Sequence, residues 1–295
     1  MFKNYLIARD KFKPDYFLYE NNKSMAAAIQ TQITRELVVE PILLNSERVS
    51  AQRRERLYWA GKRNADGSYS KVEIATPQDK GLLLQDIVLD ESEVPVSYWY
   101  DKPLEFTGKQ SGVVAIITAP WLDIMRRVYS LDSKSPTLHT CGAGNLQAKV
   151  LQNGRARKLT VREYARLQTV PEEYIFPVSN TQAYKMLGNG WTVDIIAHIL
   201  SHFKGIDQEP LDVLSMFDGM SCGQIALKKL GANVIRYCAT EIDKYAILTT
   251  QTNFPKTVQL GDAFLVRENG WTLKKSRRAA VSADDKMKEN AEEKM

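Results

Sequence analysis

Three acidic residues and one glycine loop stand close together between residues 211 and 262, in an order that suits the binding of a nucleoside. The apolar stretch 211–217 leads into the loop 218–223 (DGMSCG), and two later apolar stretches lead to Glu241 and Asp262. If these stretches are parallel strands, the loop and both acids meet at the carboxyl edge of one sheet. There a glycine turn lets a ligand approach the backbone, and an acid about 20 residues further on can bind ribose hydroxyls.

The same loop discriminates between cofactors. Phe217 and Asp218 replace the first glycine of a G-x-G-x-x-G turn, and Asp218 would repel a pyrophosphate. A cationic cofactor such as S-adenosylmethionine therefore fits better than a dinucleotide. A dinucleotide-dependent oxidoreductase and a βαβ unit without any ligand are the alternatives, and two acids at successive strand ends disfavour the latter.

The elements that must position these residues alternate between strand and helix, which predicts an α/β fold. We expect strands over 211–217, 234–240 and 258–260, with a helix from the loop to about residue 230 that Gly231 ends. The part before residue 61 should contain two helices, over 2–12 and 25–36, and two strands, over 16–19 and 38–44. A basic turn then leads into a further strand, and 61–80 should form an exposed polar connection.

Composition sets the outer limits. A chain of 295 residues with 44% hydrophobic and 25% charged residues suits one large α/β domain with a smaller attachment. The net charge of +5 is mild, so nucleic-acid binding must rest on local clusters. Three cysteines and three histidines lack zinc-site spacing, which predicts no metal. The odd cysteine count, without a signal peptide or an apolar run of about 18 residues, predicts a cytoplasmic protein outside the membrane.

A basic cluster surrounds the sequence Thr160-Val161-Arg162-Glu163, which has the form of a helix capping box. Its cations could neutralise DNA phosphates: Arg155, Arg157, Lys158, Arg162 and Arg166. A solvated helix face explains the composition equally well.

The chain resembles the DNA cytosine-5 methyltransferases of bacteria and phages. FDGMSCG at 217–223, TEID at 240–243 and GD at 261–262 resemble that family's first three motifs. YFLYEN at 16–21, the Gln-x-Arg-x-Arg pattern of Gln52, Arg54 and Arg56, and GNGW at 188–191 resemble later ones. The likeness covers about residues 1–265, and chance does not account for so many motifs together.

The resemblance implies a Rossmann-like sheet that binds S-adenosylmethionine, formed by 1–80 and 151–265, with a target-recognition lobe at 81–150 and a charged, solvated or disordered tail at 266–295. It implies methyl transfer to carbon 5 of a cytosine flipped out of double-stranded DNA, as part of restriction–modification in a bacterial or phage-infected cell. Glu20 would hold the cytosine, and Arg54 and Arg56 would brace this acid and the target phosphate, while Gln52 would join the basic cluster at the DNA. The cofactor would contact Phe217, Asp218, Gly219, Met220, Gly223, Glu241, Ile242, Asp262, Asn189 and Trp191.

Two features depart from the family. The motifs that normally close the protein precede those that normally open it, with 202–210 as the joint, which a circular permutation would permit. The sequence also lacks the Pro-Cys that carries the nucleophile, and Cys141, Cys222 and Cys238 are poor substitutes by position. The strand before that Pro-Cys is missing too, so strands 211–217 and 16–19 should lose their common neighbour. The chain is then either a permuted enzyme or an incomplete subunit that binds DNA or cofactor, with a second chain that supplies the Pro-Cys loop.

Overall fold

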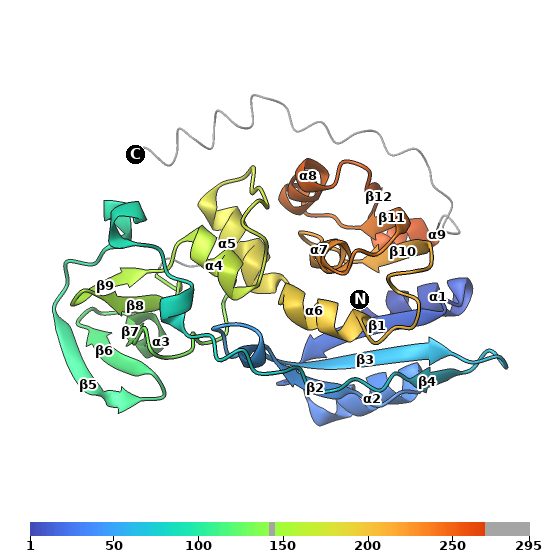
Figure 1. Cartoon of the computed structure of the whole chain (residues 1–295), viewed down its shortest axis with the longest axis horizontal. Coiled ribbons are helices and arrows are strands. Elements are labelled where there is room, and N and C mark those ends of the chain that lie inside the picture. The colour runs from blue at the N-terminus through green and yellow to red at the C-terminus, as the bar shows by residue number, and fades with distance from the viewer. Residues whose placement is uncertain (142–144, 269–295) are drawn as a thin grey trace.

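The computed structural model describes residues 1–141 and 145–268 and contains three separate sheets among helices (Figure 1). The first sheet has the order β1-β3-β2, and both β1 and β2 run antiparallel to the long central strand β3. Its strands are β1 (Tyr16–Asn22), β2 (Ile42–Asn45), β3 (Glu55–Arg63) and β4 (Tyr69–Lys71), accompanied by α1 (Phe2–Phe12) and α2 (Ala27–Leu37). Strand β4 pairs with β3 inside the stretch that we predicted to be an exposed connection, so that part of the prediction is wrong.

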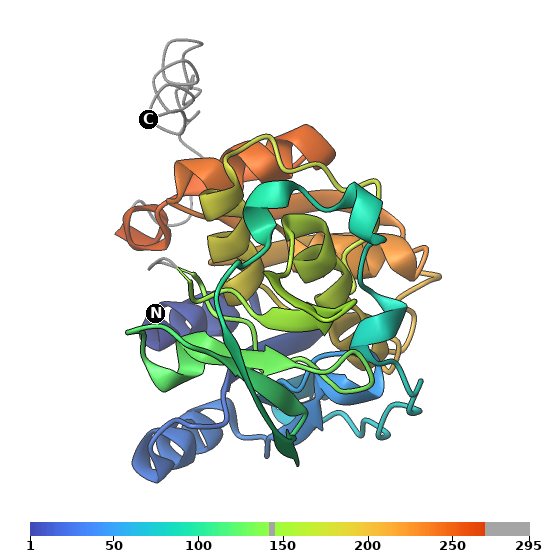
Figure 2. The same ribbon diagram turned by 90° about the vertical axis from the view of Figure 1, so that its left-hand side faces the viewer.

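The second sheet forms the smaller lobe and has the order β5-β6-β7-β8-β9. Its elements are β5 (Leu104–Gln110), β6 (Val113–Ile117), α3 (Asp123–Arg126), β7 (Arg127–Tyr129), β8 (Lys149–Gln152) and β9 (Arg155–Lys158). Figure 2 looks onto this sheet, which stands in front of the larger part of the molecule. The predicted lobe boundary at residue 150 is wrong, because it cuts through β8 and leaves β9 outside the sheet to which it belongs.

Three helices connect the lobe to the rest of the chain: α4 (Val161–Leu167), α5 (Asn180–Asn189) and α6 (Val193–Leu200). The predicted capping box begins α4, where Thr160 accepts from the Glu163 amide at 3.3 Å and Glu163 accepts from the Thr160 amide at 2.6 Å. Helix α6 is apolar on nearly all sides and lies in the main core, beside α7. These helices therefore tie the lobe to the half of the molecule that holds the glycine loop.

The third sheet is parallel and has the order β10-β11-β12, as the alternation of strands and helices predicts. It consists of β10 (Leu211–Met216), α7 (Cys222–Lys229), β11 (Val234–Thr240), α8 (Lys244–Asn253), β12 (Val258–Gly261) and α9 (Ala263–Glu268). Most of the predicted tail lies outside the described residues. In the part of the chain that the structure describes, no helix is long and apolar enough to cross a membrane.

Strands β10 and β1 each stand at the edge of their own sheet. Among the described residues β10 pairs with β11 alone and β1 with β3 alone, and the loss of a common neighbour stays a prediction. All six residues of β10 retain solvent exposure, although a strand in the middle of a parallel sheet is normally buried on both faces.

Candidate active site

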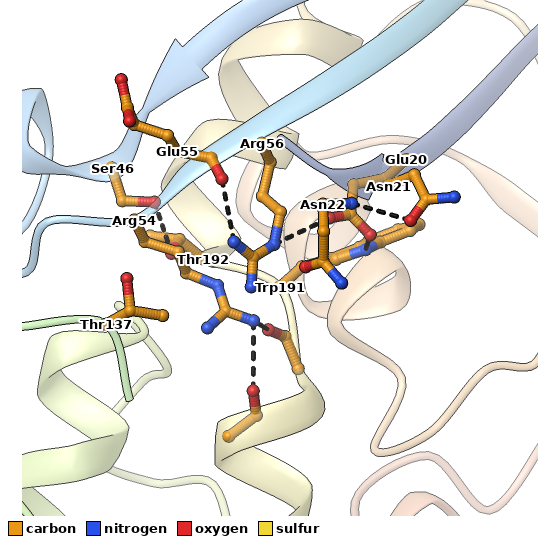
Figure 3. A network of polar contacts seen from close by, with 12 residues as sticks. Glu20, Asn21, Asn22, Ser46, Arg54, Glu55, Arg56, Thr137, Trp191 and Thr192 are labelled. Carbon is orange, nitrogen blue, oxygen red and sulfur yellow. Dashed lines mark hydrogen bonds and ion pairs between the residues drawn. The ribbon is translucent and has the colours of Figure 1, made fainter. Parts of the chain in front are cut away.

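An acid near the carboxyl end of β1 is held by two donors from different parts of the chain (Figure 3). Glu20 forms an ion pair with Arg56 of β3, with 3.0 Å between Oε1 and Nε. Its other oxygen, Oε2, accepts a hydrogen bond from the Trp191 indole at 3.2 Å. The antiparallel pairing of β1 with β3 places Glu20 near Arg56, since Glu20 lies opposite Tyr58 in the register. The carboxyl group thus has a fixed orientation before any ligand binds.

Burial raises the pKa of Glu20 above the ordinary carboxyl value, although Arg56, Trp191 and Arg54 act in the opposite direction. Desolvation disfavours the charged form of an acid more than these contacts favour it here. A carboxyl group of this kind can share a proton with a ring nitrogen more readily than an exposed one can.

Arg54 supports the site in a different way from Arg56. Its Nη2 donates to the carbonyl oxygens of Gly188 and Gly190 at 3.1 and 2.9 Å, and so fixes the turn that carries Asn189 and Trp191 (Figure 3). Its Nη1 is buried without a partner among the described residues. Burial, with the nearby Arg56 charge, lowers the pKa of Arg54 to about 10, so the group remains charged at neutral pH.

The glycine loop between β10 and α7 is closed by Glu241 at the end of β11. Glu241 accepts from the Gly219 amide at 2.8 Å through Oε2, and from the Ile242 and Asp243 amides at 2.7 and 2.9 Å through Oε1. Phe217 and Ser221, with φ of 58° and 63°, adopt left-handed backbone conformations that side chains disfavour. Such strain persists where the surroundings over-determine the backbone, which is a frequent property of ligand loops.

Asp218, the acid of the glycine loop, has one buried oxygen without a hydrogen-bond partner among the described residues. Tyr237 donates to its Oδ1 at 2.8 Å, while Oδ2 is buried without a partner. Burial raises the pKa of Asp218, and the neighbouring charge of Glu241 adds to that increase, against hydrogen bonds from serines and Tyr237. Phe217 and Ile242, which are 37% and 75% exposed, present apolar surface next to the acids. A carboxyl oxygen without a partner beside exposed apolar groups suits a ligand that is both cationic and aromatic.

The other residues predicted to contact the cofactor differ in whether their side chains are accessible to a ligand. The Met220 side chain is buried in the core, so only its backbone can face a ligand. A methyl group on Gly223 would lie 3.7 Å from the Trp191 ring, which places Trp191 beside the start of α7. Asn189 is exposed, and Asp262 accepts from the Phe264 amide at 2.8 Å as it begins α9.

Three residues that the sequence did not single out form hydrogen bonds with the glycine loop. Tyr237 bonds to Asp218, Tyr174 donates to the Met220 carbonyl at 2.6 Å, and Thr250 donates to the Gly219 carbonyl at 3.3 Å. Each lies in another segment of the chain, so no local pattern relates it to the loop. The tyrosine within the apolar stretch of β11 was the single available signal, since a buried hydroxyl needs a partner.

Two of the predicted DNA contacts are wrong, because the side chains are fully buried. Arg157 forms a buried ion pair with Glu163, at 2.6 Å between Nη2 and Oε1, and donates to Gln152. Gln52 donates to the Leu167 carbonyl and accepts from the Leu138 amide at 3.0 Å. Both residues hold the lobe and the helices together, and neither can reach a phosphate from this position.

The remaining cations of the cluster lie at the surface, where they contact aromatic rings or pair with acids. Arg155 stacks over Trp99 at 4.7 Å, and Lys158 lies 4.5 Å over the Tyr98 ring. Arg162 and Arg166 both pair with Glu172, at 2.7 and 2.6 Å. Exposed pairs of this kind are worth little and can exchange for other anions.

None of the three cysteines has the character of a nucleophile. Burial raises the pKa of each thiol, and that of Cys222, in the glycine loop, reaches about 12. A thiolate is the reactive form, so all three are protonated at neutral pH. This agrees with the interpretation that these positions are poor substitutes for a Pro-Cys.

The fold and site define an α/β protein with a nucleoside-type loop and a separate, oriented acid. The family described as C-5 cytosine-specific DNA methylase matches residues 1–205, which is more than half of the chain. The chain therefore belongs to this family, and the predicted resemblance and α/β methyltransferase fold class are confirmed. The methyl donor of the family is S-adenosylmethionine.

Individual relatives match over shorter lengths. The type II methyltransferase M.Eco47II of Escherichia coli is 33% identical over 168 residues, which cover 49% of this chain and 40% of that protein. M.HhaI of Haemophilus parahaemolyticus is 31% identical over 157 residues, or 50% of this chain and 47% of that protein. The chain thus spans about half the length of the curated relatives it matches. The solved S. pombe Dnmt2 methyltransferase superposes with a TM-score of 0.46 and 18% identity over 65% of each chain.

Proposed function

We propose that this chain is the cofactor- and base-binding part of a DNA cytosine-5 methyltransferase. Its substrate would be double-stranded DNA, its methyl donor S-adenosylmethionine, and its setting restriction–modification in the cytoplasm of a bacterial or phage-infected cell. The observation that carries the proposal is the combination of an oriented acid, Glu20, with a loop in which one buried oxygen of Asp218, Oδ2, lacks a partner among the described residues. Family membership supports the same reading.

Glu20 is the residue for the cytosine. With Arg56 and Trp191 fixing its two oxygens, the carboxyl group could share its proton with the ring nitrogen of a flipped base, and so make carbon 6 electrophilic. The cofactor supplies the methyl group when bound. Asp218 would face its positive charge, and Glu241 would face its ribose once the loop has formed around the ligand.

The nucleophile is the part that we assign to a second chain. In the reaction, a thiolate sulfur bonds to carbon 6, the methyl group moves to carbon 5, the proton on carbon 5 is lost, and the sulfur is eliminated. Electrostatics from Glu20 and Arg54 cannot replace that covalent step. A partner with a Pro-Cys loop would supply it.

Calorimetry with S-adenosylmethionine and with NAD tests the cofactor assignment. We expect saturable binding of S-adenosylmethionine, weakened in Asp218→Asn because the variant loses the negative charge that faces the cation. Binding of NAD in preference to S-adenosylmethionine would support the oxidoreductase alternative and overturn the proposal.

A further inference from the structure

Helix α5 has one exposed face, and this face carries both Asn189 and a lysine that the sequence did not single out. Most residues of α5 are buried, whereas, after its first residue, the exposed ones are Thr181, Lys185 and Asn189. These three follow one another at intervals of four residues, so their side chains lie on the same side of the helix. The face that presents a predicted cofactor contact, Asn189, therefore also presents Lys185.

Lys185 joins this face to the turn that follows β11. Its Nζ lies 2.8 Å from Oδ2 of Asp243, which is 58 residues further along the chain. The other carboxyl oxygen of Asp243, Oδ1, accepts from the Tyr245 amide at 2.9 Å and so caps α8. Asp243 is thus held from two directions, and Lys185 supplies the contact that reaches α5.

Hydrogen bonds continue from Asp243 to the glycine loop. The Asp243 amide donates to Oε1 of Glu241 at 2.9 Å, and Oε2 of Glu241 accepts from the Gly219 amide at 2.8 Å. A connected path of polar contacts therefore runs from Lys185 through Asp243 and Glu241 to Gly219. The orientation of Glu241 depends on α5 as well as on the loop that it closes.

The charges of the pair support this connection. A hydrogen bond to Asp243, together with the charge of that acid, raises the pKa of Lys185, and Glu241 adds to the increase. Burial acts to raise the pKa of Asp243, but the bond from Lys185 and the amides of α8 outweigh it and lower that pKa below the ordinary value. Both groups therefore carry their charges at neutral pH, and Lys185 offsets the repulsion between the two acids of the turn.

An exposed ion pair usually contributes little to stability, because ordering two long side chains offsets the attraction. Here the carboxyl group is short, 27% exposed and already fixed by the cap of α8, so Lys185 alone must be ordered. Ile242, between the two acids, is 75% exposed, so burial of its side chain does little to fix the turn. Polar contacts therefore determine the position of residues 241–243.

We propose that Lys185 is a positioning residue of the cofactor site, which fixes the turn 241–243 through Asp243 before the cofactor binds. The inference rests on the proposed function, because it takes Glu241 to be the acid that faces the ribose. A turn that is already fixed loses less conformational freedom when a ligand binds. Since changes at one site alter dissociation more than association, the contact should mainly slow the release of the cofactor.

The release of radiolabelled S-adenosylmethionine from the full chain, chased with excess unlabelled cofactor, tests the assignment. We expect Lys185→Met to release it about three-fold faster than the wild type, with an unchanged association rate. An effect of this size lies within the range of an exposed ion pair. Lys185→Arg keeps a cation within reach of Asp243 and should release the cofactor at the wild-type rate.

Asp243→Asn separates the ion pair from the helix cap. Asparagine caps a helix about as well as aspartate does, but it carries no charge. We expect this variant to release the cofactor as fast as Lys185→Met, and the double variant to be no faster than either single one, because all three lack the same contact. At about 1 M salt, which screens exposed charges beyond about 3 Å, Lys185→Met and the wild type should become equal.

Lys23→Met is the matched control. Lys23 also forms a 2.8 Å pair, with Glu55, and its side chain is exposed to the same extent as that of Lys185, 49%. Its loss should leave both rates unchanged. The urea midpoint of Lys185→Met should equal that of the wild type, since a positioning role affects the ligand and not the stability of α5.

Four results would overturn the assignment: a wild-type release rate in Lys185→Met, additive effects in the double variant, fast release from Lys185→Arg, or a lowered urea midpoint that accounts for the faster release. The wild type separates this inference from the proposed function. If it does not bind S-adenosylmethionine, the proposed function is refuted, and the role of Lys185 with it. If it binds but Lys185→Met releases the cofactor no faster, the role of Lys185 alone is refuted.

Discussion

The β1–β3 sheet and the β10–β12 sheet carry complementary parts of the proposed site, but they differ in how completely the oxygens of their acids are paired. In the β1–β3 half, both oxygens of Glu20 have donors within the protein. In the β10–β12 half, Asp218 keeps a buried oxygen without a partner, and Phe217 and Ile242 are exposed beside it. The acid of the proposed base-binding half is therefore held by contacts within the protein, whereas the proposed cofactor half has a buried carboxyl oxygen and exposed apolar groups that are available to a ligand.

Removing Arg56 should lower the free energy of unfolding, because Arg56 pairs with the acid of the proposed base-binding half. Arg56→Ala leaves Glu20 without its ion pair, and loss of one partner of a fully buried pair costs roughly 3–5 kcal/mol. Because 16% and 17% of the two side chains remain exposed, we expect the free energy of unfolding to fall by about 2–4 kcal/mol in urea titrations. Lys23→Ala, which breaks the exposed 2.8 Å pair with Glu55, should change it by less than about 1 kcal/mol. Equal effects of the two variants would contradict the account.

Removing Glu241 should instead affect the cofactor half through ligand affinity. Glu241→Ala deprives the Gly219, Ile242 and Asp243 amides of their acceptor, and we expect weaker binding of S-adenosylmethionine by roughly 1–3 kcal/mol in calorimetry. Glu36→Ala, at an exposed acid of α2, serves as the control. Undiminished binding by Glu241→Ala would remove the loop from the cofactor site.

The raised pKa of Glu20 makes the stability of the base-binding half depend on pH. An acid whose pKa is higher in the folded than in the unfolded protein binds more protons when folded, so its contribution to stability falls as the pH rises from the ordinary carboxyl pKa to the raised one. Relative to Glu20→Gln, the wild type should thus lose stability on going from acidic to neutral pH. Urea unfolding of both proteins across that range measures the difference. A relative gain by the wild type would show that the contacts of Glu20 outweigh its burial.

The smallest expected effect is that of Arg155, at the surface of the lobe, on DNA affinity. If Arg155 contacts a phosphate, Arg155→Ala should reduce the slope of log affinity against log salt by about 1 for duplex DNA. Arg157→Ala should not act in this way, because Arg157 is buried, and it should instead destabilise the lobe by roughly 3–5 kcal/mol. A complex that is insensitive to salt would refute phosphate contacts by this cluster.

Much of this arrangement could be predicted from local patterns. The three strands and the glycine loop of the cofactor half, the helix over 2–12 and the capping box of α4 all follow from periodicity and turn chemistry within a few residues. The position of Glu20 near Arg56 came from the family resemblance, since the two residues belong to different strands.

The rest depends on contacts between distant elements. Charge alone could not tell Arg157 from its neighbours, because burial of that one cation is decided by Glu163 on α4 and Gln152 on β8. The bonds of Tyr174 and Tyr237 to the loop, and that of Tyr5 to Leu18, likewise join segments whose proximity no local pattern specifies. The lobe boundary was misplaced for the same reason, since β9 pairs with β8 across a tight turn at residues 153 and 154.

Transfer of tritiated methyl groups from S-adenosylmethionine to mixed-sequence duplex DNA tests the central claim most directly. The chain should be assayed alone and with a fragment that carries an apolar strand followed by Pro-Cys, and a Pro-Ser version of that fragment is the control. We expect turnover only with the Pro-Cys fragment, because the proposed function assigns cofactor and base to this chain and the thiolate to a partner. Robust turnover by the chain alone, abolished by changing Cys141, Cys222 or Cys238 to serine, would contradict the account.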